Sequence, residues 1–226
     1  MKRSGFLALS GGLVAVSRTA ASAQMAAPTP PMLPLQRGLT FQLHAAFFSR
    51  ETNASPPIDP QVFVVDDRVT KGGTGPQGIE YIAGVRPMRF NIEPDVPLVN
   101  AEGSPLLFTV SRWIAATGSA SIADAEGVSQ DITVRFSHLI GFGVYSLFKN
   151  TFSAAGVVFT PLDGEGTHNT FKADEAGNGT FALNTPDRLT NRNAILLVYH
   201  SDGMDHGSQR GKIGYDAHHH LIASLA

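Results

Sequence analysis

The sequence predicts an all-β protein built as a single β-sandwich of jelly-roll or immunoglobulin-like type, with about 8–10 strands. Three observations lead to this prediction. The chain of 226 residues contains 23 glycines and 14 prolines, which are too many breakers for long helices. Only 16% of its residues are charged, which suits short strands joined by tight turns. Apolar runs rich in β-branched and aromatic residues recur between the breakers, without the periodicity of an amphipathic helix.

The composition excludes several classes of function. Lys and Arg total 17 against 19 Asp and Glu, which gives a net charge of −2, so no nucleic acid partner is expected. Cysteine is absent. Disulfides, thiolate metal sites and blue-copper centres are therefore excluded, and His, Met and carboxylates remain as metal ligands.

Residues 1–23 have the layout of a cleaved signal peptide. Lys2 and Arg3 precede an apolar stretch, and the small residues at 21–23 form a cleavage site. The stretch is shorter than the about 20 residues that span a bilayer, so we expect no membrane span in the mature chain. The Lys-Arg pair is also similar to a degenerate twin-arginine signal, which leaves the export route open. We expect a periplasmic or extracellular protein.

The mature chain is predicted to begin with a Pro-rich leader at 24–38, followed by the β-sandwich domain at 39–226. Residues 39–48 alternate apolar and polar side chains, as a half-buried strand does. Further strands are predicted at 62–65, 79–92, 106–115, 119–123, 132–140, 144–148 and 157–159. Runs at 171–174 and 180–183 flank Asn178-Gly179, which is a strong hairpin signal.

Two final strands, at 194–200 and 215–225, are joined by a Gly-rich loop. Five of the eight histidines fall in this region. Alternation on the last strand directs His219 toward a core and places His218 and His220 together on the opposite face. A His-X-His pair on a strand is half of a Zn²⁺ or Cu²⁺ site.

The loop before this strand supplies further candidate metal ligands: His200, Asp202, Met204, Asp205 and His206. The thioether of Met204 suits Cu(I). If the two strands pair from Gly214 onward, His200 and His218 lie about 13 Å apart, too far to share one ion. They converge only if the last strand starts near Ala217. We therefore keep two sub-sites apart, one at His200 and His206 and the other at His218 and His220.

The pattern Tyr199-His-Ser-Asp-Gly203, His206-Gly207, Gly211, Gly214 and His218-X-His-Leu221 follows a Phe171-X-Ala-Asp-X-X-Gly-X-Gly-X-Phe181 segment. Together these residues resemble the C-terminal part of certain secreted bacterial β-domain proteins of unassigned function. The resemblance covers about sixty residues of this chain. It implies a secreted β domain and assigns no role to any residue.

These observations favour an exported protein whose His-rich surface site binds Cu or Zn in a carrier or accessory role. The alternative is a structural or adhesive cell-envelope protein without catalytic activity. The sequence does not decide whether the protein is an enzyme, and a non-catalytic role is favoured because Ser201 lacks a Gly-X-Ser-X-Gly elbow. The expected partner is a metal ion or small ligand, and the sequence identifies no protein partner.

Overall fold

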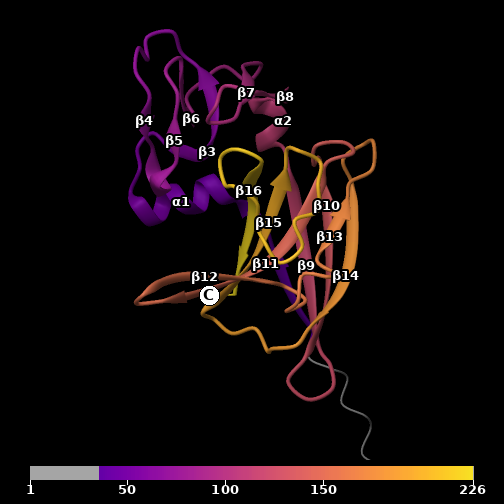
Figure 1. Cartoon of the computed structure of the whole chain (residues 1–226). Helices are drawn as coiled ribbons and strands as arrows, with labels where there is room; N and C mark the ends of the chain where they lie inside the picture. Colours follow the sequence, from indigo (N-terminus) through magenta and orange to yellow (C-terminus); the bar gives the residue numbers. More distant parts are fainter. Residues whose placement is uncertain (1–35, 226) are drawn as a thin grey trace, which may run out of the picture. The chain divides into compact units, whose positions relative to one another are not determined.

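Antiparallel sheets make up most of the structure, a computed structural model that describes residues 36–225. Strands contain 48% of the described residues and helices contain 9%, so the prediction of a mostly-β structure is confirmed. The predicted signal peptide and the leader as far as residue 35 lie outside the described residues. Figure 1 shows the structure coloured along the sequence, from indigo near the N-terminus to yellow at the C-terminus.

The first sheet has four strands in the order β1 (Gln36–Thr40), β9 (Thr117–Asp124), β10 (Gln130–Ser137) and β14 (Gly179–Thr185). β1 therefore begins inside the segment assigned to the leader. Ile132, Val134 and Phe136 of β10 are buried, and the residues between them are more exposed. This period-two pattern gives the sheet one core-facing side.

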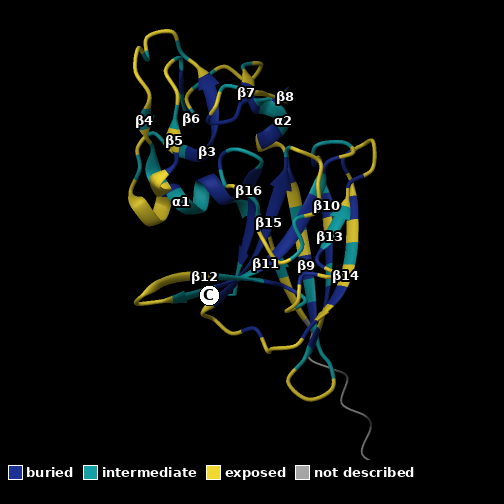
Figure 2. Ribbon diagram, in the orientation of Figure 1, coloured by how far each residue is buried: buried dark blue, intermediate teal, exposed yellow. Residues whose placement is uncertain are grey.

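The second sheet runs in the order β12 (Gly156–Pro161), β11 (Val144–Ser153), β15 (Asn193–His200), β16 (Ala217–Ser224) and β2 (Gln42–Leu43), and β13 (Thr170–Lys172) also pairs with β11. The predicted antiparallel pairing of the last two strands is confirmed. Every residue of β15 is buried, and both strands are dark blue in Figure 2. Both faces of the sheet are therefore covered at β15 and β16.

The two faces of this sheet belong to different hydrophobic clusters. Leu197 and Leu221 pack in the main core with Ile132 of the first sheet. On the other face, Leu196 lies in a second cluster against Phe47 of helix α1 (His44–Thr52). Continuous apolar character in β15 reflects this double burial.

A third sheet has the order β6 (Val85–Arg89), β3 (Ile58–Val65), β7 (Pro97–Val99) and β8 (Pro105–Thr109). A separate two-stranded sheet pairs β4 (Gly73–Thr74) with β5 (Glu80–Tyr81), and the 3₁₀ turn η1 (Pro76–Gly78) lies between these two strands in the chain. Val62 and Leu98 of this sheet join the main core. The structure thus has more strands than predicted, sixteen in all within residues 36–225, and its several sheets do not confirm a single sandwich.

In two of the predicted strands, the second half is a helix. The strand expected at 39–48 stops at Leu43, and the chain continues as α1. The helix is held in place because Ser49 exchanges hydrogen bonds with the backbone of Ile58, donating to its carbonyl at 3.1 Å and accepting from its N–H at 2.9 Å. The strand expected at 106–115 ends in α2 (Val110–Ile114), which buries Trp113.

The prediction of a hairpin around Asn178-Gly179 is wrong. β13 pairs with β11 of the second sheet, whereas β14 pairs with β10 of the first. The intervening turn carries the chain from one sheet to the other. Oδ1 of Asp174 accepts the backbone N–H of Asn178 at 2.7 Å and stabilises this crossing.

Candidate metal-binding site

The loop between β15 and β16 brings together three of the predicted ligands. β16 starts at Ala217, which pairs with His200, so the long loop that convergence required is present. One ligand atom from each of His200, Asp202 and His206 lies within 4.8 Å of the others. These three residues can hold a metal ion.

His200 forms the buried base of the cluster. It is the last residue of β15 and only 1% exposed. Its Nε2 lies 2.6 Å from Oγ of Ser146, whereas its Nδ1 has no hydrogen-bond partner within residues 36–225. Burial, together with the nearby His206, lowers the pKa of His200 to about 4, so the ring is neutral at pH 7.

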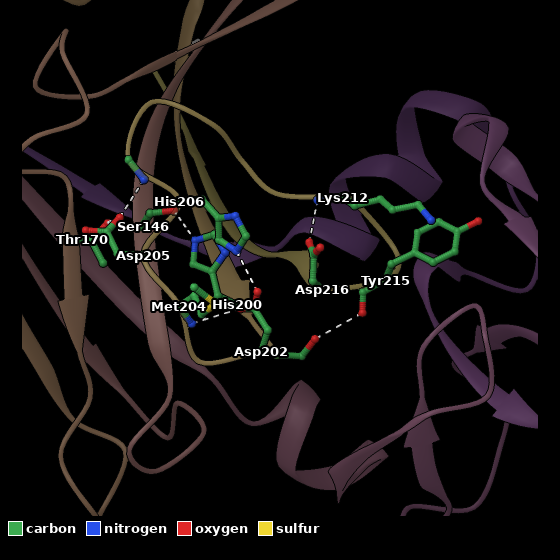
Figure 3. A network of polar contacts seen from close by, with 12 residues as sticks. Ser146, Thr170, His200, Asp202, Met204, Asp205, His206, Lys212, Tyr215 and Asp216 are labelled. Carbon is green, nitrogen blue, oxygen red and sulfur yellow. Dashed lines mark hydrogen bonds and ion pairs between the residues drawn. The ribbon is translucent and has the colours of Figure 1, made fainter.

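Asp202 and His206 form the accessible side of the cluster. Their side chains are 29% and 21% exposed, and Nε2 of His206 lies 3.0 Å from Oδ2 of Asp202. The rings of His200 and His206 stack with centroids 4.8 Å apart. Figure 3 shows this stack with the Asp202 carboxylate reaching the His206 ring.

The carboxylate of Asp205 in the same loop has a structural role. Oδ1 of Asp205 accepts from Oγ1 of Thr170 at 2.9 Å and from the N–H of Gly207 at 2.8 Å. These bonds tie the loop to β13. The side chain of Met204 is exposed, and its N–H donates to Oδ1 of Asp202 at 3.0 Å. Met204 therefore belongs to the same loop segment as the cluster (Figure 3).

The prediction that His218 and His220 project outward is wrong, because both are at most 1% exposed. Nδ1 of His218 donates to the Gln61 carbonyl at 2.8 Å, and its Nε2 accepts from Oγ of Ser201 at 3.2 Å. Nε2 of His220 donates to the Trp113 carbonyl at 2.8 Å, and the two rings stack at 3.7 Å. Burial lowers the pKa of His218 to about 4 and that of His220 to about 3.

His218 and His220 share one side of the strand, as alternation predicts, but that side faces the main core instead of solvent, and both rings lie against Trp113. A β-bulge opposite Leu197 and Val198 also directs Leu221 into this core. His219 is interior, as predicted, and its backbone N–H donates to Oε1 of Gln61.

Ser146 is a residue of this site that the sequence did not indicate. It lies on β11 and is 1% exposed. It reaches His200 only because β11 and β15 are neighbours, with Val144 opposite His200. Nothing local to residue 146 signals this contact.

Within the described part of the chain, no helix has the length and apolar character needed to cross a bilayer. Comparison with family models, curated proteins and solved structures gives no match to this chain. Function must therefore be inferred from the site itself.

Proposed function

We propose that this is an exported protein that binds Zn²⁺ or Cu²⁺ through His200, Asp202 and His206, as a metal carrier or accessory protein. The observation that carries the proposal is the buried Nδ1 of His200, which lacks a partner within residues 36–225 beside a second imidazole and a carboxylate. A buried polar atom without a hydrogen bond is rare in folded proteins.

The arrangement suits metal ligation chemically. If Nε2 of His200 carries the proton, it donates to Ser146 and leaves the lone pair of Nδ1 for a metal. Neutral imidazole is the form that binds metal, and His200 is neutral at pH 7. Imidazole and carboxylate ligands suit Zn²⁺ and Cu²⁺.

The exposure of the other two ligands supports a carrier role. Asp202 and His206 are partly exposed, so an ion can reach the site from solvent and leave it again. Three protein ligands leave at least one position for water, for the thioether of Met204 or for a ligand of a receiving protein. Export rests on the signal-like residues 1–23.

Calorimetric titration of the purified protein with Zn²⁺ and with Cu²⁺ tests the proposal. We expect one ion per chain with a Kd of about 1 μM or tighter. His206→Ala and Asp202→Asn should weaken binding at least about tenfold, because each removes one ligand of a three-ligand site. Ser146→Ala should weaken it about 10- to 100-fold by removing the partner that orients His200.

His138→Asn is the matched control, since His138 is exposed and its positive φ of 60° suits Asn. It should bind both metals like the unmodified protein. Absence of binding, or equal affinity in His206→Ala and His138→Asn, would refute the proposal.

A structural or adhesive envelope role is the second candidate. Val157 and Val158 are 42% and 59% exposed on β12, which is an edge strand of the second sheet. An exposed apolar edge favours association with another strand. Sedimentation of a Val158→Lys variant distinguishes this role, because an adhesive edge predicts self-association that the added charge abolishes.

A further inference from the structure

A pocket of about 630 Å³ lies apart from the metal cluster and shares none of its residues. It is lined by η1 and the residues that follow, by Val157 and Phe159 of β12, by the 210–215 segment of the last loop, and by His219. Its volume falls within the roughly 300–1,000 Å³ of small-molecule sites. Its walls are mainly apolar and aromatic, with two cationic side chains, Arg210 and Lys212, and one acidic side chain, Glu80.

Arg210 is the unusual feature of this pocket. Its guanidinium carbon lies 3.5 Å from the centre of the Phe159 ring. Its Nη1 donates to Nε2 of His219 at 2.9 Å. Among residues 36–225, no carboxylate lies within ion-pair distance of it.

Three other arginines among residues 36–225 have acidic partners. Arg68 and Arg86 both pair with Asp66 at 2.8 Å, and Arg188 pairs with Asp124 at 3.1 Å. Arg210 lacks such a partner, and although burial lowers its pKa to about 10, the group is still charged at pH 7. A partly buried cation without a counter-charge is costly unless an anion joins it.

The hydrogen bond to His219 satisfies little of this guanidinium. Nδ1 of His219 faces Nε2 of Gln61 at 3.0 Å, so donor groups approach both ring nitrogens. A neutral imidazole accepts at only one nitrogen. Since a guanidinium has five N–H donors, at least four have no acceptor within the described residues.

We infer that this pocket binds a small organic monoanion, a carboxylate with an aromatic or aliphatic body. The carboxylate pairs with Arg210, whose planar fork matches two carboxylate oxygens. The apolar body contacts Phe159 and Val157. Lys212, with its Nζ 3.4 Å from the centre of the Tyr215 ring, adds positive charge, and Glu80 disfavours a second negative charge on the ligand.

Titration with 1-naphthoate and its neutral analogue 1-naphthamide tests this inference, by calorimetry at pH 7. We expect naphthoate to bind and the amide to bind at least about tenfold more weakly, because a charge-assisted pair with a desolvated guanidinium is lost. Arg210→Met keeps an apolar stem over Phe159 and should weaken naphthoate binding by at least about tenfold. Arg68→Met is the control and should leave binding unchanged, since Arg68 lies outside the pocket.

Val157→Asp is a second variant that does not depend on replacing a packed side chain, because Val157 is partly exposed. It places a negative charge in the pocket and should weaken naphthoate binding more than naphthamide binding, because the amide loses only the apolar contact with Val157. No naphthoate binding up to about 5 mM, equal binding of the acid and the amide, or unchanged affinity in Arg210→Met would overturn the inference. None of these results bears on the metal cluster.

Discussion

Lowering the pH from 7 to 5 should reduce the free energy of unfolding by about 8 kcal/mol, because five buried histidines are neutral in the folded protein. Burial lowers the pKa of His44, His200 and His218 to about 4 and that of His220 to about 3, and it lowers the pKa of His219 well below 6.5. The unfolded chain therefore takes up protons below pH 6.5 that the folded protein does not. The contribution of these neutral histidines to the free energy of unfolding is fully present above pH 6.5 and is lost as the pH falls below that value.

The magnitude follows from the pKa values. Between pH 7 and 5 each such histidine contributes about 1.8 kcal/mol at about 1.36 kcal/mol per pH unit, so the five together contribute about 9 kcal/mol. Asp59 acts in the opposite direction, because burial raises its pKa from 3.8 to about 6, and it offsets about 1 kcal/mol. Carboxylates with ordinary pKa values titrate mainly below pH 5 and contribute little in this window.

Denaturant unfolding in the presence of a chelator, followed by the fluorescence of the single tryptophan Trp113, measures this dependence. His220→Phe keeps a ring against Trp113 and should make the dependence shallower by about 1.4 kcal/mol per pH unit between pH 4 and 6. His138→Asn, at an exposed position, should retain the original slope. Equal stability at pH 7 and pH 5, or an unchanged slope in His220→Phe, would show that the buried histidines are not held neutral.

Two further changes test the packing. Gly177→Ala should destabilise the protein by about 3 kcal/mol or more, because the φ of Gly177 is +83° and a Cβ there would collide with the Leu139 carbonyl oxygen. Gly127 has a φ of +69° and lies in open space, so Gly127→Ala should cost only about 1 kcal/mol. Thermal unfolding compares the two, and equal losses would contradict the predicted collision. Ile132→Ala should lower the free energy of unfolding by about 2–5 kcal/mol, because Ile132 is 1% exposed in the main core, and a loss under 1 kcal/mol by denaturant titration would contradict that packing.

Local sequence patterns predicted the parts of the fold that depend on neighbouring residues. The β10 strand and the pairing of β15 with β16 were predicted because apolar periodicity and breakers report on a single strand or ribbon. The helix α1 was missed because its aromatic residues resemble a strand, and its position is set by the second cluster beneath Phe47. That cluster forms from segments distant in the chain.

The candidate site was predicted in part for the same reason. His200, Asp202 and His206 are close in sequence, and the glycines between the last two strands predict the loop that joins them. The environment of His218 depends on Gln61 and that of His220 on Trp113, which are more than 100 residues away. Only tertiary structure shows that both sides of the last strand are covered.

X-ray absorption spectroscopy of the protein loaded with one equivalent of Zn²⁺ tests the proposed metal site most directly. We predict two imidazole nitrogens and a carboxylate oxygen at about 2.0–2.2 Å, with the remaining position filled by a light atom or by sulfur at about 2.3 Å. The imidazole signal should fall to one ring in His206→Ala. A spectrum with oxygen ligands alone, or one unchanged in that variant, would contradict metal binding by His200, Asp202 and His206.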